Sequence, residues 1–507
     1  MAVKVNFNEA AAQTHTALIR NERLMNKSLL RLSTGMRILN ASDDSAGMFI
    51  SDMLSTVAKG YDQGNKNIQT GISALQIAET SAGQIFDKLQ EIYVRAQNAA
   101  NDINDPVARA ALQQEIRNFV DAIQKIGADT EYNGIKLLDG TFKDKYIHYG
   151  ARLEQTVYLS VEDIRAQNLG AHIIKTSGYK AQALSMTGLT GVASFTEAQT
   201  VSIGGRVIDA SFQYNNMHII DAGKIAEEVN DKLVDIGFKA KAINVSVGER
   251  YTGIANVSGT ATLTFYVGGK QATVTAETIV SLNELIEKIN RAAATNGVDL
   301  TASADAGRLV LTSSKGYTIG LQVNLTTSTT TGIVINIHQL INDLEDKSTG
   351  SITAPSSGTA TTAAAVKVGD LYVANEKDFT AELDVGGKNW GNYEIGSAAG
   401  SEFKNLYSID VNTNEGAEAS MLIAEIALRR VDNIRAQIGA TMNNLQSIFE
   451  SQKVAYDNTK EAESVIRNTD YAKEMAEFTT LQIRMQATIA MLAQANTLPQ
   501  LVLQLLR

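Results

Sequence analysis

Few side chains in this sequence are placed to do chemistry. Asp43 and Asp44 are adjacent carboxylates that could hold a cation, but no histidine stands near them and the calcium-loop spacing is missing. Gly-Gly-Lys turns at 268–270 and 386–388 lack the flanking residues of a phosphate-binding loop. The five histidines are scattered without an H-E-x-x-H pattern, and cysteine is absent, which excludes disulfides and thiol nucleophiles. We therefore predict no catalytic residue, no metal site, no cofactor and no enzyme activity.

Composition excludes further classes of function. The 507 residues carry a net charge of −10, and no basic stripe is present to neutralise phosphates, so nucleic acid is not an expected partner. The N-terminus lacks the apolar segment and cleavage site of a secretory signal peptide. No apolar run reaches the length that spans a bilayer, so we expect no membrane insertion.

Two apolar stripes with heptad-like spacing, one near each end of the chain, are the strongest pattern. Steps of three, four or seven residues are typical of helices that present a stripe to partner helices. We name these eleven residues the assembly seam: Leu18, Met25, Leu29, Leu32, Met36, Leu39, Phe478, Leu481, Met485, Ile489 and Leu492.

A long amphipathic helix with one such stripe is not stable on its own in water. Each buried Leu-sized side chain contributes roughly 1.5–3 kcal/mol, whereas ordering each residue costs about 1–2 kcal/mol of backbone entropy. The two terminal segments are therefore expected to pair with each other and with neighbouring molecules, and to gain structure on assembly. A bundle that closes on itself within one chain is the alternative.

Helical patterns follow the first stripe and precede the second. A long helix is predicted through 68–99, after a segment that Gly60 and Gly64 loosen. Asp105 and Pro106 form a helix start, and a helical stripe runs from 415 to 448. Asn133-Gly134 indicates a hairpin, with 135–138 and 157–161 as its flanking strands.

The middle of the chain is rich in Gly, Thr, Val and Ser and reads as strands and turns. It contains two weakly similar β-α-β-like units, each with a Gly-Gly turn followed by a helical stretch, which suggests a duplicated module. The predicted fold is α+β and multidomain: the N- and C-terminal helices pair into a coiled coil and helical bundle, and a β-rich outer domain is inserted between them.

The predicted domain boundaries follow these changes in composition and in apolar pattern along the chain. Residues 1–42 with 463–507 form a terminal coiled-coil core, and 43–175 with 403–462 form a helical rod with a β-hairpin. Residues 176–402 form the variable outer domain, with β-α-β-like units at about 198–258 and 259–325 and a β-rich remainder.

Several motifs resemble those of bacterial flagellins. They are RLSTGMRI at 31–38, ASDDSAG at 41–47, GISAL at 71–75 and NGIKLL at 133–138, then RAQIGA at 435–440, LAQAN at 492–496 and the final Leu-Leu-Arg. The resemblance covers about the first 170 and the last 105 residues. In that family the paired termini line a tube, the next helices surround them, and the middle projects outward.

The resemblance implies a structural subunit that polymerises with itself into the extracellular flagellar filament for swimming motility. It also implies unfolded export through the flagellar type III apparatus, an export chaperone that binds the C-terminal helix, growth under a filament cap protein, and attachment through hook–filament junction proteins. Exposed Ser and Thr of the outer domain are often O-glycosylated in such proteins, which makes one stretch a candidate: Thr326, Thr327, Ser328, Thr329, Thr330 and Thr331.

One departure from the family concerns the vertebrate Toll-like receptor that detects flagellins. The helix bearing Leu89 and Gln90 matches the recognised region, and Glu115 fits it. Recognised members carry an Arg where this chain has Glu91 and a Leu where it has Arg95. Because these changes oppose an interface evolved for other charges, we expect weak or absent receptor activation.

Other functions stay open at this point. A hook–filament junction protein would share similar end helices and form a short collar. An outer domain with adhesive activity, in residues 176–400, is compatible with a filament role. An outer protease domain is disfavoured because the metal-binding motif is missing.

Overall fold

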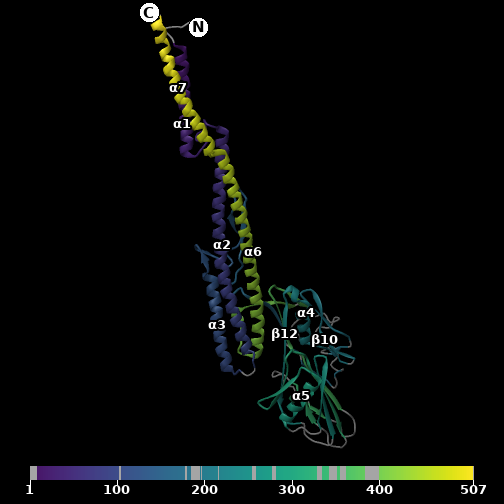
Figure 1. Ribbon diagram of the computed structural model, residues 1–507. Helices are drawn as coiled ribbons and strands as arrows, with labels where there is room; N and C mark the ends of the chain where they lie inside the picture. The colour runs from purple at the N-terminus through teal and green to yellow at the C-terminus, as the bar shows by residue number, and fades with distance from the viewer. Residues whose placement is uncertain are drawn as a thin grey trace. The chain divides into compact units, whose positions relative to one another are not determined.

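The computed structural model describes residues 8–101, 104–176, 178, 180–183, 186, 194–195, 197–214, 216–253, 259–276, 281–327, 334–341, 351–353, 361–382 and 399–505. The chain divides into two compact units (Figure 1). The first unit comprises Met1–Gln76, Asp144–Ser160 and Gly439–Arg507, and the second comprises Ile77–Lys143 and Val161–Ile438.

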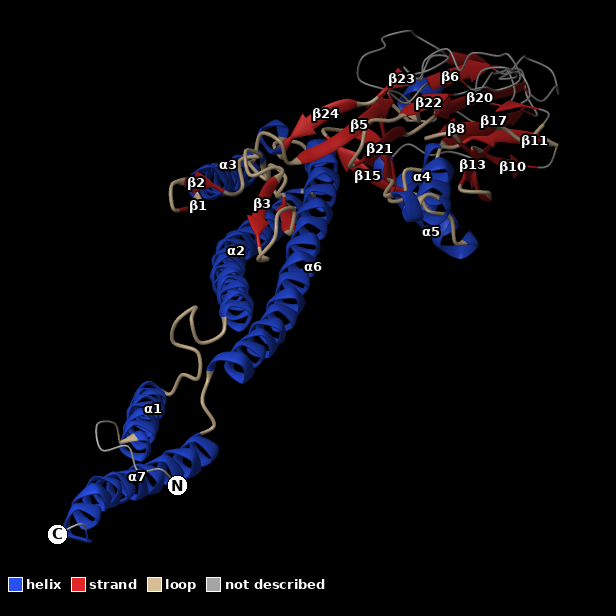
Figure 2. Ribbon diagram, turned by 90° about the horizontal axis from the view of Figure 1, so that it is seen from above, coloured by secondary structure: helices blue, strands red, loops and turns tan. Residues whose placement is uncertain are grey.

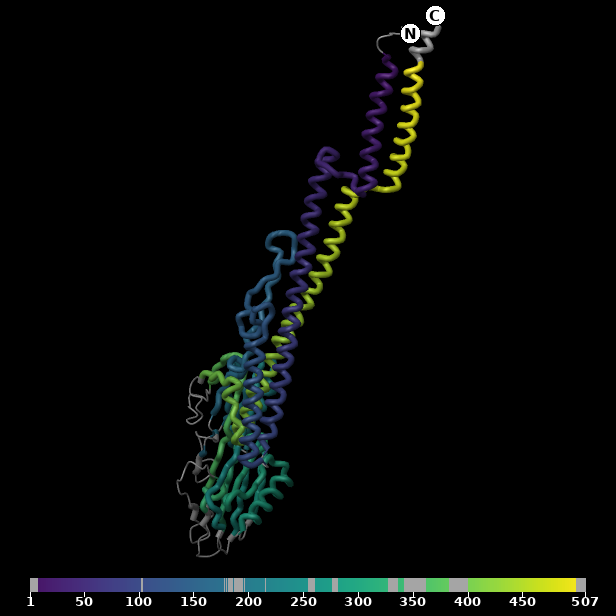
Figure 3. The backbone as a smooth tube through the Cα atoms, turned by 90° about the vertical axis from the view of Figure 1, so that its left-hand side faces the viewer, coloured from purple at the N-terminus to yellow at the C-terminus, as the bar shows by residue number. Residues whose placement is uncertain are grey.

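In the first unit the terminal helices α1 (Glu9–Thr34) and α7 (Tyr471–Leu505) run antiparallel, side by side (Figure 3). The Asn8 side chain caps α1 by accepting from the Ala11 amide (3.1 Å), and its Nδ2 donates to the Ala495 carbonyl (2.8 Å). At the other end Gly35, with φ 72°, terminates α1, and its carbonyl accepts from the Thr469 amide (2.9 Å). The predicted pairing of the two chain ends is confirmed.

Two longer helices continue from this pair. They are α2 (Ser45–Ala99) and α6 (Asn414–Arg467), whose first-unit parts lie side by side in Figures 1 and 3. In the first unit Arg467 of α6 contacts the Asp52 carboxylate of α2 (3.2 Å). The strands β3 (Lys145–His148) and β4 (Thr156–Leu159) form an antiparallel hairpin in the same unit.

The β3–β4 hairpin packs on a stripe of glycines in α2. Gly60, Gly64 and Gly71 share one face of the helix, and a Cβ on Gly64 would overlap the carbonyl oxygen of Tyr149. Asn67, on the same face, donates to the His148 carbonyl (2.9 Å). Our expectation that Gly60 and Gly64 loosen the chain is wrong, because α2 continues unbroken through both. The missing side chains let the hairpin backbone approach the helix.

The second unit contains the remaining parts of α2 and α6 and the helix α3 (Pro106–Asp129). Asp105 accepts from the Ala108 amide (2.7 Å), which confirms the predicted helix start. The strands β1 (Glu131–Tyr132) and β2 (Ile135–Lys136) flank Asn133-Gly134, both with positive φ, as a tight hairpin requires. The second predicted flank is wrong, because Val157 pairs with Ile147 of β3 instead.

The inserted region of the second unit consists of small antiparallel sheets and two helices, α4 (Ala222–Lys232) and α5 (Leu282–Asn296) (Figure 2). A six-stranded sheet has the order β15 (Thr301–Asp305), β16 (Arg308–Ser313), β12 (Lys239–Arg250), β21 (Asp370–Asn375), β5 (Gly170–Thr176) and β24 (Glu402–Asn405). A five-stranded sheet has the order β14 (Lys270–Ala276), β13 (Gly259–Val267), β17 (Ile319–Thr327), β20 (Thr361–Lys367) and β6 (Lys180–Ala183).

Three smaller sheets complete the part of the region that the structure describes. One has the order β23 (Ala399–Gly400), β22 (Thr380–Glu382), β8 (Thr200–Ile203) and β9 (Arg206–Asp209). Another has the order β10 (Ser211–Tyr214), β11 (Met217–Ile220) and β7 (Ser194–Phe195). The strands β18 (Val334–Asn336) and β19 (Ser351–Thr353) form a pair. The short 3₁₀ turns η2 (Val234–Ile236), η3 (Ile337–Gln339) and η4 (Leu406–Ser408) connect these elements.

The helices α4 and α5 are each bound to a strand by one asparagine side chain, which hydrogen-bonds both backbone groups of a single strand residue. Asn230 of α4 donates from Nδ2 to the Ala240 carbonyl (2.8 Å) and accepts from the Ala240 amide (2.9 Å). Asn290 of α5 makes the same two bonds to Ala302, at 2.9 and 2.7 Å. A strand pair joined by two glycines with positive φ precedes each helix. The pair β13–β14 comes directly before α5, whereas β10 and β11 lie between the pair β8–β9 and α4.

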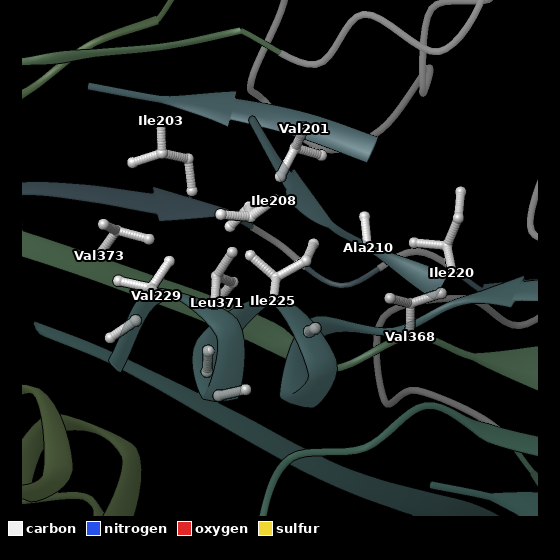
Figure 4. Packing of buried hydrophobic residues seen from close by; sticks show 14 of the residues in the cluster. Val201, Ile203, Ile208, Ala210, Ile220, Ile225, Val229, Val368, Leu371 and Val373 are labelled. Atoms are coloured by element: carbon white, nitrogen blue, oxygen red, sulfur yellow. The ribbon is translucent and has the colours of Figure 1, made fainter. Parts of the chain in front are cut away.

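Each helix also covers its own apolar core. In the core beneath α4, Ile225 and Val229 lie against strand residues such as Ile208 and Leu371 (Figure 4). Beneath α5, Leu285 and Ile289 lie in a separate cluster that includes Phe265. The described residues of the inserted region therefore form two hydrophobic cores rather than one.

The glycine stripe yields a test. Gly64→Ala adds a methyl group against the Tyr149 carbonyl, so the hairpin must shift, and we expect a loss of roughly 1–3 kcal/mol in the free energy of unfolding. Chemical denaturation, with hydrogen exchange of residues 145–159, measures this loss.

Gly439→Ala in α6 is the matched control, since its Cβ meets nothing within 4 Å. It should stabilise the protein by about 1 kcal/mol through helix propensity. Equal effects of the two substitutions would contradict the packing role of Gly64.

Candidate self-assembly surface

The less exposed side chains of α1 recur at steps of three and four residues, as a heptad pattern requires. They include Leu18, Met25 and Leu32, but also the polar residues Asn21 and Ser28 between them. The corresponding face of α7 carries Glu474, Phe478, Leu481, Met485, Thr488, Leu492 and Ala495. Cross-helix contacts join Asn21 Nδ2 to Thr488 Oγ1 (3.1 Å) and Arg31 Nη1 to Glu474 Oε2 (3.6 Å).

The structure separates the residues of the assembly seam into three groups. Seven lie on the covered faces of α1 and α7, and these are Leu18, Met25, Leu32, Phe478, Leu481, Met485 and Leu492. Leu39 is half-buried in the connection between α1 and α2. Leu29, Met36 and Ile489 are instead 53%, 37% and 51% exposed, and Met36 bridges Asn468 beyond the end of α1.

Large apolar side chains outside the covered faces remain exposed to solvent. We call this set the apolar flanks: Ile19, Leu24, Leu29 and Leu30 on α1, and Met475, Ile483, Ile489 and Met491 on α7. Each is at least 39% exposed. An exposed apolar surface of this kind marks a site of interaction. The α1–α7 pair therefore buries one stripe internally and leaves further large apolar side chains exposed.

The connection between α1 and α2 is held by the adjacent carboxylates Asp43 and Asp44. Asp43 accepts from Lys27 Nζ (2.6 Å) and from the amides of Leu39 and Asn40 (3.2 Å each), and the Lys27 hydrogen bond lowers its pKa to about 2. Asp44 accepts from the Gly47 amide (2.9 Å) at the start of α2. Both carboxylates therefore accept hydrogen bonds from backbone amides, and Asp43 also binds the Lys27 ammonium.

A charged cluster lies on the second-unit part of α2. The Arg95 guanidinium stands between the carboxylates of Glu115 (2.6 Å) and Glu91 (3.4 Å), and Glu115 raises the pKa of Arg95. Leu89 is buried, whereas Gln90 is exposed. Sequence reasoning named all of these residues but did not predict that Arg95 pairs with both acids.

The candidate glycosylation stretch is only partly described. Thr326 is exposed near the end of β17, which Thr327 terminates, and residues 328–331 lie outside the described residues. Within the described part of the chain, no three His, Cys, Asp or Glu side chains gather as a metal site would require. No helix among those residues is both long and apolar enough to cross a membrane.

The sequence analysis did not predict the polar residues on the covered faces of α1 and α7. Successive steps of three, four and three residues from Leu18 lead to Asn21, Met25 and Ser28. The heptad spacing alone therefore indicates that Asn21 and Ser28 lie on the covered face. A heptad pattern of apolar residues alone omits Asn21 and Ser28 and includes Leu29 and Ile489, which belong to the apolar flanks.

Terminal helices that pair across the whole sequence, with apolar flanks and an inserted β-rich region, define a structural protein built for helical self-assembly. Family profiles match three segments: "Bacterial flagellin N-terminal helical region" at 5–143, "Bacterial flagellin C-terminal helical region" at 421–506 and "Flagellin hook IN motif" at 262–315. The chain belongs to the bacterial flagellin family.

Three curated relatives match over their whole length and that of this chain. A flagellin of Aquifex pyrophilus is 47% identical over 521 residues, and one of Aquifex aeolicus is 45% identical over 533 residues. A B-type flagellin of Pseudomonas aeruginosa is 30% identical over 509 residues. The chain is thus a structural protein of the extracellular flagellar filament, which serves motility.

Proposed function

We propose that this chain is the main filament subunit, and that neighbouring copies complete the α1–α7 pair by covering its apolar flanks. The observation that carries the proposal is the exposure of eight large apolar side chains around a seam that is already paired. Covering half of such a side chain contributes on the order of 1 kcal/mol. Eight of them, repeated at every subunit, supply a driving force for polymerisation.

The proposal assigns three domains along the chain. Residues 1–42 with 463–507 form the filament core, 43–175 with 403–462 the rod, and 176–402 the outer domain. A contact between distant segments of the chain supports the first boundary: Arg37 donates from its amide to the Arg467 carbonyl (2.7 Å) and from Nη2 to the Ile466 carbonyl (2.6 Å). These bonds stand where α6 ends and α7 begins.

A hook–filament junction protein is the alternative within the same assembly. The identity to flagellins over the full length of both chains supports the main subunit. An adhesive role of residues 176–400 would accompany the filament role rather than replace it.

Export and accessory partners follow from the family. We infer that the chain leaves the cell unfolded through the flagellar type III apparatus, with an export chaperone on α7. The exposed apolar residues of α7, such as Ile483 and Met491, support this assignment because a chaperone would cover them before assembly. A filament cap protein and junction proteins complete the set of partners.

Assembly on seeds tests the main proposal. The double variant I483D/I489D places two carboxylates on the apolar flank of α7, and we expect filament elongation to fall at least about tenfold. Electron microscopy and sedimentation of seeded, purified protein measure the elongation rate.

The control variant Q482D/Q486D adds the same charges at exposed polar positions of α7 and should elongate at a rate closer to that of the parent protein. Loss of assembly in both variants alike would show that charge alone is responsible. Undiminished growth of I483D/I489D would contradict the proposal.

We also propose that this protein activates the flagellin-sensing Toll-like receptor weakly or not at all. The pairing of Arg95 with Glu91 and Glu115 supports this, since a receptor would have to displace a satisfied ion-pair cluster.

The variant E91R/R95L should raise potency in reporter cells by about tenfold or more, because it removes both mismatches. D62R/K66L, which alters another exposed ion pair of α2 with the same spacing, is the control and should leave potency unchanged. Full potency of the parent protein would refute the proposal.

A further inference from the structure

Polar residues interrupt the covered faces of α1 and α7 where an apolar side chain would pack better. Ser28 and Glu474 are only 3% and 7% exposed. The Ser28 Oγ and the Arg31 Nε have no hydrogen-bond partner among the described residues. Burying polar atoms in this way weakens a helix pair. Their position inside the contact therefore calls for a role other than stability.

The apolar layers do not distinguish one alignment of the helices from another. Sliding α7 by one heptad would exchange Met485 for Phe478 or Leu492 against the same residues of α1. All three are large and apolar, so the buried area would change little. The apolar residues alone thus leave the register of α1 against α7 weakly defined.

The polar layers do distinguish the alignments. After the same slide, Asn21 would face Leu481 or Ala495 in place of Thr488, and its amide would lose the 3.1 Å hydrogen bond. Arg31 would lose Glu474 and leave a nearly buried carboxylate unpaired. A buried polar group without its partner is penalised far more than a paired one.

We propose that Asn21–Thr488 and Arg31–Glu474 are positioning pairs, which fix the register of α1 against α7 at a cost in stability. This inference deepens the proposed function and rests on it, because the register sets which exposed apolar residues of α1 and α7 lie at the same height for neighbouring copies to cover. A polar residue inside a coiled-coil contact is known to specify register in this manner.

The absence of cysteine allows a direct test by disulfide formation. M25C/M485C reports the native register, one layer from Asn21–Thr488, and M25C/F478C reports a shift by one heptad. Each pair is oxidised in the monomer and in filaments, and the intramolecular product is measured by gel mobility and peptide mapping. The parent protein should form the native disulfide almost exclusively.

N21L/T488L should raise the ratio of shifted to native disulfide about tenfold, since the hydrogen bond that discriminates the registers is gone. The exchanged pair N21T/T488N should restore the parent ratio, which a merely structural role would not predict. T16L/T480L, at exposed positions of the same helices, is the control. R31M/E474M tests the second pair in the same way.

An unchanged ratio in both N21L/T488L and R31M/E474M would overturn the inference, whether or not filaments form. Failure of the parent protein to elongate on seeds would overturn the proposed function instead. The disulfide ratio in the monomer would still report the register, so the two failures are distinguishable.

Discussion

The antiparallel contact between α1 and α7 joins residues that are more than 400 positions apart, and everything between them depends on it. It joins the two terminal helices into one antiparallel pair. The inserted region is therefore an insertion whose two ends both connect back to this pair. The contact is built from single stripes with polar interruptions, so its stability within one molecule is limited. Other copies of the chain would stabilise the α1–α7 pair further by covering its apolar flanks.

The rest of the fold holds the helices that extend from this contact. Gly35 and the Asp43 carboxylate shape the turn from α1 into α2, and the glycine stripe of α2 seats the β3–β4 hairpin. In the second unit a row of lysines binds glutamates of α6: Lys175 to Glu415 (2.7 Å), Lys241 to Glu418 (3.2 Å) and Lys239 to Glu425 (2.9 Å). The six-stranded sheet is therefore bound to α6 along its side as well as joined to it by the chain.

Features that depend on local sequence were predictable. The heptad steps indicated the terminal pair, Asp105-Pro106 the start of α3, and Asn133-Gly134 its following hairpin. Features that depend on a distant partner were not. A glycine in a helix is unfavourable alone, and only the hairpin backbone against Gly64 explains it. Likewise Asn21 reads as a surface residue until Thr488 is placed opposite.

The central claim is that α1 and α7 are completed by neighbouring copies. Hydrogen exchange of residues 9–34 and 471–497, compared between monomer and filament, tests it most directly. We expect these amides to exchange much faster than those of α2 and α6 in the monomer, and to become strongly protected in the filament. Equal and strong protection of both segments in the two states would contradict the account.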